Sequence, residues 1–453
     1  MQALPDNIVA YLNKFSTYDY EIEWNESTGI DNVIVIPAIT EYDNIKILLD
    51  SISRCESTYF SSTLILFVIN NPPSAIDEVK ADNRKSLRLL REIISGNQSD
   101  EFIGKIIYSG LQIGLVDASS TGKELDENNS GVGLARKIGM DLALTVFDYS
   151  VNGKKIILCL DADCTVSENY ITSVVDEFNY QNCNVAIVNF EHLTDEKYET
   201  NDAIICYELF LRYYVAGLRY AKSDYAFHTI GSTMVCDHIA YIKAGGMNKR
   251  EAAEDFYFLE KLSKSYEIYE INSATVYPSS RKSWRVPFGT GQRVTRFLEQ
   301  TYNEYFLFNP EVFELLKLWL VIFKSDDLIT TKQYLDAAKK NHEELYYFLI
   351  KQDFDKQWNK ILSNSKSERQ LTLQKKLWFD GFKTLKLIHH LRDTAFPQLN
   401  MFDALDKMFN KLKIDSKINR MGTDIPSYKI QIEYLQLLRE LDRKTINNQM
   451  QLL

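Results

Sequence analysis

Two carboxylates, one residue apart, follow a strongly apolar run in this sequence. The run is Ile156–Leu160, and Asp161 and Asp163 come directly after it. Alternate side chains of an extended chain point the same way, so both carboxylates can face one ligand. Mg²⁺ or Mn²⁺ bound by one or two carboxylates completes its shell with water and phosphate oxygens. The spacing therefore predicts a metal site at Asp161 and Asp163 that holds a diphosphate, although aspartates are also common in ordinary turns at strand ends.

A second pair of carboxylates, Glu254 and Asp255, begins a predicted helix downstream. Carboxylates suit the positive end of a helix macrodipole, so this position has a purely structural explanation. The functional interpretation makes Asp255 a general base, which takes the proton of an attacking hydroxyl.

Basic residues near these acids could hold an anionic ligand. Arg136 lies in Gly131–Gly139, which predicts the start of a helix, where free N–H groups also favour anions. Arg281 and Arg285 flank Trp284 in a segment that is not expected to be regular. The two arginines could brace a leaving diphosphate, and Trp284 could stack on a sugar or a base.

The elements that must position these residues follow an α/β pattern. Short β-branched runs alternate with amphipathic segments over the first 300 or so residues, as in a mostly parallel sheet with helices on both faces. A helix is expected at Tyr42–Cys55 and a loop at Gly114–Ser130. Ligands of such sheets bind beyond the carboxyl ends of the strands. The predicted strands are Val33–Ile36, Leu64–Ile69, Lys105–Tyr108, Lys155–Leu160, Val185–Phe190 and Ile268–Val276.

A change in pattern near residue 302 predicts a second domain. Strand signals fade there, glycine becomes rare, and aromatic, lysine-rich helical patterns take over. We therefore expect an α/β domain at 1–301 and a helical C-terminal region at 302–453, whose role the sequence does not indicate.

Composition narrows the class of protein. The net charge of −10 argues against a nucleic-acid partner. No secretory signal or transmembrane segment is expected, which leaves peripheral membrane contact open. The six cysteines include no C-x-x-C pair and lie mostly in apolar runs, so we expect reduced thiols and a cytoplasmic location.

Taken in order, these motifs resemble family 2 glycosyltransferases. The resemblance covers roughly residues 30–300 and rests on Val33–Glu41, Asn70-Asn71, Gly133–Gly139, Asp161–Asp163, Gly231–Met247 and Glu254-Asp255. It implies a GT-A fold, in which a Rossmann-like mixed sheet binds a nucleotide-diphosphate sugar through Mn²⁺ or Mg²⁺. The acceptor would be a carbohydrate or glycoconjugate, attacking in one inverting displacement with Asp255 as base. The donor-binding residues implied are Pro37, Glu41, Asn70, Arg136, Asp161, Arg281 and Arg285.

Three other functions are compatible with parts of this pattern. A retaining transferase could use the same fold. A sugar-phosphate nucleotidyltransferase would need a Gly-rich, Arg-containing loop after the first strand, where this chain has Pro37–Thr40. A non-catalytic carbohydrate-binding or scaffold protein predicts damaged metal and base positions, whereas Asp161, Asp163 and Asp255 are all present.

Overall fold

A computed structural model of the protein describes residues 4–16, 19–194, 200–281, 290–301, 303–325, 330–420 and 422–450, with only the backbone of 129, 290 and 445–450. The structural statements below concern these residues. The chain forms two compact units. The first comprises Met1–Leu193 and Thr229–Gln292, and the second comprises Thr194–His228 and Arg293–Leu453.

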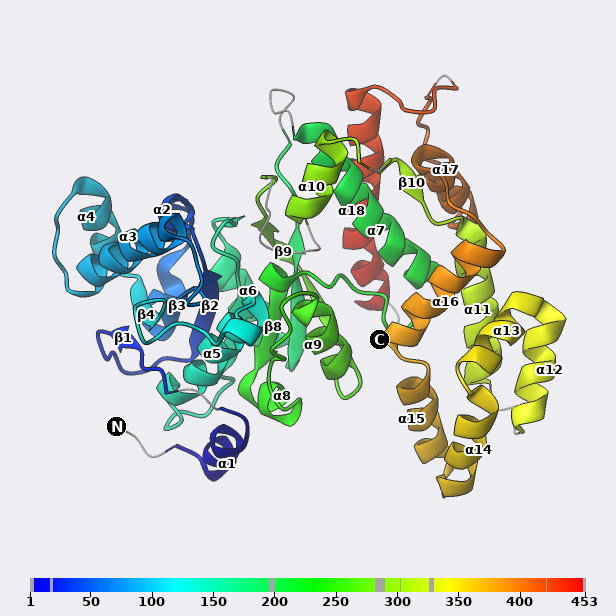
Figure 1. The fold of residues 1–453 in the computed structure, drawn as a ribbon, viewed down its shortest axis with the longest axis horizontal. Coiled ribbons are helices and arrows are strands. Elements are labelled where there is room, and N and C mark those ends of the chain that lie inside the picture. Colours follow the sequence, from blue (N-terminus) through cyan, green and yellow to red (C-terminus); the bar gives the residue numbers. More distant parts are fainter. Residues whose placement is uncertain are drawn as a thin grey trace. The chain divides into compact units, whose positions relative to one another are not determined.

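The first unit is built on one nine-stranded mixed sheet, in the order β1-β4-β3-β2-β5-β8-β7-β9-β6 (Figure 1). Strands β4, β3, β2 and β5 are parallel, and β8 runs antiparallel between β5 and β7. The strands are β1 (Glu23–Trp24), β2 (Asn32–Ala38), β3 (Thr63–Asn70), β4 (Gln112–Ala118), β5 (Ile156–Cys159), β6 (Thr165–Val166), β7 (Val185–Phe190), β8 (Met234–Asp237) and β9 (Tyr269–Tyr277).

Helices cover this sheet, and for that reason the central strands are mostly apolar. Every residue of β2 and β3 is buried, as expected when both faces of a parallel sheet are covered. The helices are α1 (Asp6–Phe15), α2 (Tyr42–Ser53), α3 (Asp77–Ile94), α4 (Glu101–Tyr108), α5 (Val132–Val146), α6 (Tyr170–Tyr180), α8 (His238–Lys243) and α9 (Glu254–Ser263), with 3₁₀ turns η1 (Ser57–Ser62), η2 (Glu127–Asn129) and η3 (Gly231–Thr233).

One predicted strand is wrong. Lys105–Tyr108 belongs to helix α4, and the strand of this region is β4, in a segment that the sequence analysis assigned partly to a loop. The Asp100 side chain caps α4 by accepting a hydrogen bond from the Ile103 N–H at 2.8 Å. Ile103 and Ile106 then share a buried face, so the short apolar run has helical rather than alternating periodicity.

The second unit is helical and has an aromatic core that includes Trp319, Phe323 and Trp358. Helices α7 and α18 pack against each other (Figure 1). The helices are α7 (Asn201–Tyr220), α10 (Thr290–Leu298, mostly in this unit), α11 (Pro310–Lys324), α12 (Thr331–Asn341), α13 (Glu343–Lys351), α14 (Phe354–Asn364), α15 (Glu368–Trp378), α16 (Gly381–Thr394), α17 (Met401–Lys411) and α18 (Tyr428–Met450), and β10 (Phe306–Leu307) pairs with β11 (Leu399–Asn400).

The strand order confirms the predicted α/β class, a Rossmann-like mixed sheet with a C-terminal helical region. The division into two units differs from the single boundary expected near residue 302, because Thr194–His228 belongs to the same unit as the C-terminal helices. Helix α7 binds there through close packing. A Cβ on Gly217 would come within 2.5 Å of the Phe313 ring, so only glycine fits against α11. Within the described residues, no helix is both long enough and apolar enough to span a bilayer.

Candidate functional site

The candidate site lies where the strand order reverses. From β2 the chain builds β3 and β4 on one side, and then places β5 on the other side of β2. In open α/β sheets, this switch point leaves a crevice at the carboxyl ends of the two strands, where ligands bind. Glu41 follows β2 there, and Asp161 and Asp163 follow β5.

Pro37 ends the pairing between β2 and β5 at the crevice. The last hydrogen bond runs from the Leu160 N–H to the Val35 carbonyl, at 3.1 Å. Residues two apart on a strand face the same neighbour, so Pro37 also faces β5, but proline has no N–H to donate. The hydrogen-bond ladder between the two strands therefore stops, and the chain that follows β5 is no longer paired with β2 when it reaches Asp161. Pro37 is buried and acts here on the backbone.

The two predicted metal ligands are only partly exposed, and each contacts an arginine. The side chain of Asp161 is 39% exposed, and one of its oxygens accepts a hydrogen bond from Arg136 at 2.5 Å. That of Asp163 is 24% exposed, and one of its oxygens lies 3.0 and 3.1 Å from two nitrogens of Arg281. Among the described residues, nothing hydrogen-bonds to the second oxygen of either carboxylate. Each can therefore still donate one oxygen to a cation.

Arg136 connects the two predicted carboxylate pairs. Its side chain is only 1% exposed and forms ion pairs with Asp161 and with Glu254. Burial alone would lower the pKa of Arg136, but these two charges raise it above its usual value. A Cβ on Gly231 would lie 2.9 Å from an Arg136 nitrogen, so glycine at η3 makes room for the guanidinium. Glu254 and Gly231 belong to segments on which the family resemblance rests, but neither was predicted as a site residue from the sequence.

The glycines before Arg136 do not form an open anion site in this structure. A Cβ on Gly131 would lie 2.4 Å from the Glu251 Cα, and one on Gly133 would lie 2.3 Å from the Arg250 carbonyl oxygen. The glycines therefore allow the segment before α9 to pack directly against the start of α5. This contact sets the position of α9 and of its first-turn carboxylates.

Asp255 joins the same cluster. Ala253 has a left-handed backbone (φ 58°), an uncommon conformation for a residue with a Cβ, and α9 starts immediately after it. Burial, and then the charge of Glu254, raises the pKa of Asp255 to about 7. Burial likewise raises the pKa of Asp161 to about 6, against the attraction of Arg136. The charge of Asp161 also raises the pKa of Asp255, so the predicted metal and base positions lie close together.

Arg281 bridges the crevice from one strand end to the other. Its guanidinium forms ion pairs with Glu41, after β2, and with Asp163, after β5. Glu41 is only 4% exposed, and Asn44 donates a hydrogen bond to it at 2.5 Å. Arg281 thus lies between the carboxylates of Glu41 and Asp163, one of the two predicted metal ligands. Arg285 lies outside the described residues.

Asn70 lies at the site but is largely committed to the backbone. Its side-chain amide donates hydrogen bonds to the carbonyls of Ala38 at 3.1 Å and Val68 at 3.2 Å, and it is 4% exposed. Asn83 of α3, which the sequence did not single out, donates to the Asn70 carbonyl and accepts from the Thr40 N–H. These amides fix the turn after β2, and no described residue donates a hydrogen bond to the Asn70 side-chain oxygen.

The donor set for a metal is small. In the described part of the chain, no group of three or more His, Cys, Asp or Glu side chains is arranged as a metal site. A cation at Asp161 and Asp163 would therefore depend on water and phosphate oxygens for the rest of its shell, a pattern common for Mg²⁺. The hard oxygen donors fit this ion class.

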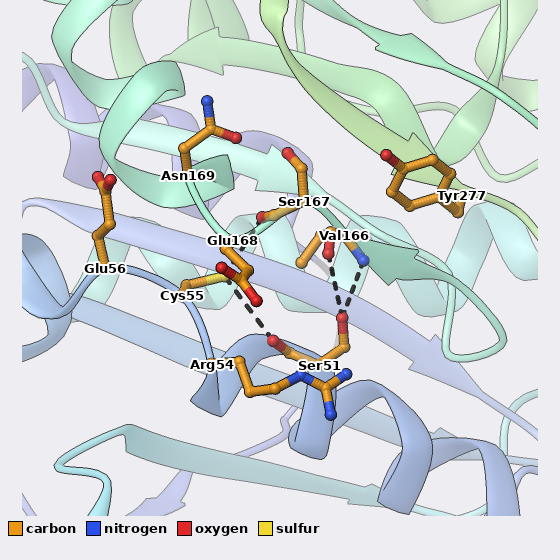
Figure 2. Close-up of a pocket in the computed structure, with 9 residues that line it drawn as sticks. All are labelled: Ser51, Arg54, Cys55, Glu56, Val166, Ser167, Glu168, Asn169 and Tyr277. Carbon is orange, nitrogen blue, oxygen red and sulfur yellow. Dashed lines mark hydrogen bonds between the residues drawn. The ribbon is translucent and has the colours of Figure 1, made fainter.

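A separate cavity of about 620 Å³ lies between the end of α2 and the turn from β6 to α6 (Figure 2). Ser51 donates to the Val166 carbonyl and accepts from the Val166 N–H, and Tyr277 at the end of β9 lies at the rim. No residue predicted from the sequence as a site residue lines it.

The sequence matches neither a protein-family model nor a curated protein sequence. Among solved structures it is similar to TarS of S. aureus, at 10% identity and a TM-score of 0.36, covering 68% of this chain and 48% of that one. The chain thus spans about half of that structure. For TarS 1–349 in complex with UDP-GlcNAc the values are 11% and 0.37, and with UDP 10% and 0.36, each covering 92% of both chains. We base the function on the site itself, because this similarity is too low to carry it.

Proposed function

We propose that this protein is a glycosyltransferase that moves a sugar from a nucleoside-diphosphate sugar to a hydroxyl of a carbohydrate or glycoconjugate acceptor. The observation that carries the proposal is the meeting of the β5 carboxylates with the first turn of α9 at the switch point of the sheet. A crevice at this point suits a nucleotide. Asp161 and Asp163 are suited to bind a cation, and Asp255 beside them is suited to accept a proton. This combination fits a reaction in which a hydroxyl attacks while a diphosphate leaves.

Asp161 and Asp163 would hold Mn²⁺ or Mg²⁺, each through the oxygen that its arginine does not engage. When bound, the cation supplies positive charge that neutralises the diphosphate. Arg281, which lies beside Asp163, would add a guanidinium to the same diphosphate.

Asp255 is the proposed base. The acceptor oxygen forms a bond to the anomeric carbon while the bond from that carbon to the diphosphate oxygen breaks, and the electron pair leaves with the diphosphate. Asp255 takes the hydroxyl proton. With a pKa of about 7, the carboxylate is partly deprotonated at neutral pH and still basic enough to accept that proton. A single displacement of this kind inverts the anomeric configuration.

Donor binding is the first test. We expect one nucleoside-diphosphate sugar from a panel to raise the melting temperature of the full chain only when Mn²⁺ is present. Ligand at about 100 times its Kd stabilises a protein by about 2.7 kcal/mol, which a thermal shift assay detects easily. Asp163→Asn should abolish the Mn²⁺-dependent shift while its own melting curve stays cooperative. A shift of equal size in Asp163→Asn, or without Mn²⁺, would contradict the proposed metal site.

The stereochemistry of the product separates the remaining alternatives. NMR of the glycoside formed from the donor identified above should show inversion at the anomeric carbon. Retention would exclude Asp255 as the base of a single displacement. Donor binding without any transfer to a panel of sugar acceptors would favour a non-catalytic carbohydrate-binding protein.

A further inference from the structure

The helical unit contains a cavity of about 580 Å³ between the last turns of α11, the helix α15 and the turn at Ser223–Tyr225. Its floor is apolar and consists of Leu320, Phe323 and Phe379, each at most 5% exposed. The volume lies within the range of about 300–1,000 Å³ that is typical of small-molecule sites.

The walls of this cavity are fixed by contacts that do not involve a ligand. The Tyr225 hydroxyl donates to the Lys376 carbonyl at 3.1 Å, and the Lys375 ammonium donates to the Ser325 carbonyl at 2.8 Å. The rings of Phe323 and Phe379 pack edge to face, with their centroids 6.2 Å apart. A ligand would therefore enter a preformed site and would not have to order it.

One face of α15 opens onto the cavity. Arg369, Thr372, Leu373 and Lys376 line it, and their spacing of three, four and seven residues places them along a single helical stripe. The stripe has a cation near each end and an apolar side chain between them. Leu373 is 48% exposed, so apolar surface continues from the floor of the cavity to its mouth.

Within the described residues, the two cations of this stripe have no ion-pair partner. Lys324, which also lines the cavity, forms an ion pair with Asp224 at 2.8 Å. By contrast, among the described residues nothing forms a hydrogen bond or ion pair with the side chain of Arg369 or Lys376. Arg369 lies in the first turn of α15, where the helix macrodipole disfavours a positive charge. Its own helix therefore does not explain why a cation stands there.

We propose that this cavity binds an anionic amphiphile, a molecule with a phosphate or carboxylate head and an apolar chain. The head lies between Arg369 and Lys376, and the chain lies on Leu320, Phe323 and Phe379. A small anion would leave the apolar floor wet, and a neutral apolar molecule would leave both cations without a counter-charge. A free amphiphile and a lipid in a bilayer present the same chemistry, so the experiment separates them.

Binding of dodecyl phosphate to the full chain, measured by calorimetry below the micellar concentration, tests this site. We expect saturable binding, at least about tenfold weaker binding of dodecyl maltoside and none of inorganic phosphate, since a tenfold change corresponds to about 1.4 kcal/mol. The double variant Arg369→Gln/Lys376→Gln should weaken dodecyl phosphate about tenfold or more. The matched control Lys332→Gln/Lys340→Gln, on exposed positions of α12, should bind like the wild type.

Filling the cavity supplies a second variant. Thr372 is exposed at the cavity wall, so Thr372→Trp should fold and block the chain while both cations remain. Flotation with vesicles containing phosphatidylglycerol then assigns the source: retention that depends on Arg369 and Lys376 indicates a bilayer lipid, and binding of the monomer alone indicates a free amphiphile. Absence of dodecyl phosphate binding, or equal binding by the wild type and the Arg369/Lys376 variant, would overturn the proposal.

Discussion

Both units contain a cluster of carboxylates around a buried arginine, yet the two clusters have opposite charge balances. In the first unit, one arginine, the buried Arg136, forms ion pairs with both Asp161 and Glu254, and Asp255 lies beside them. Carboxylates outnumber the cation, and burial raises the pKa values of Asp161 and Asp255.

In the second unit, two carboxylates face several cations. Asp442 of α18 pairs with Arg212, Arg219 and His228, and Glu208 of α7 pairs with Arg212 and with Arg439 of α18. Although burial opposes its charged form, His228, Arg219 and Arg212 hold the pKa of Asp442 well below its usual range.

The difference separates a structural ion network from a candidate active site. A buried carboxylate that is fully ion-paired holds two helices together, and its ionised form stabilises the fold. A carboxylate whose charge is not matched costs stability, and such a site retains capacity for a cation, a proton or a substrate.

The largest expected effect is the loss of sugar transfer in the variant Asp255→Asn. An amide cannot accept the hydroxyl proton, so kcat should fall by about 10²–10⁴-fold, the usual contribution of a general base. Mn²⁺-dependent donor binding should persist, which steady-state kinetics and the thermal shift assay together measure. Asp77→Asn is the matched control, because Asp77 also lies in the first turn of a helix but is exposed and forms no part of the carboxylate cluster. Equal activity of Asp255→Asn and Asp77→Asn would reduce Asp255 to a helix-dipole residue.

Asp442→Asn should have the largest effect on stability. The change removes the partner that Arg212, Arg219 and His228 share, and breaking a buried pair from one side costs about 3–5 kcal/mol. Calorimetry should show a lower melting temperature. Asp393→Asn removes an exposed partner of Arg392 and should change stability by less than about 0.5 kcal/mol. Equal melting temperatures of the two variants would refute the contrast drawn here.

The two clusters should also respond to pH in opposite directions. The folded pKa values of Asp161 and Asp255, about 6 and about 7, lie above the usual value of 3.8, so without metal their cluster destabilises the protein as pH rises from 4 to 8. Asp255→Asn should recover about 1–2 kcal/mol at pH 8, after allowance for screening by solvent. The folded pKa of Asp442 is depressed, so its contribution is present above pH 4 and is lost as pH falls below that. Melting curves across this range measure both.

The smallest expected effect concerns Arg281. Its guanidinium pairs with Asp163 and Glu41, so it competes with a divalent cation in the absence of donor. Arg281→Gln should strengthen Mn²⁺ binding about twofold to fivefold, which corresponds to about 0.4–1 kcal/mol, within the range typical of a partly exposed ion pair. The same variant should bind the nucleoside diphosphate more weakly. Electron paramagnetic resonance of free Mn²⁺ follows the first quantity, and unchanged Mn²⁺ affinity would remove Arg281 from the metal site.

The sequence by itself determined the α/β class, five of the central strands and the carboxylates at their ends. Apolar runs such as Ile156–Leu160 can only be buried strands or helices, and an abrupt stop at Asp161 and Asp163 marks the edge of the sheet. The adjacent carboxylates Glu254 and Asp255 also predicted the start of α9, because carboxylates in the first turn suit the positive end of the helix dipole.

Only the tertiary structure decided which charges meet. Arg136 and Glu254 are 118 residues apart, and Arg281 and Glu41 are 240 apart, so no local pattern reports their pairing. The short run at Lys105–Tyr108 was misassigned because a few apolar residues fit either periodicity until the cap at Asp100 is seen. Charge balance, and hence the contrast between Asp255 and Asp442, is a property of packed neighbours, because burial and partner charges set a pKa and neither is written in adjacent residues.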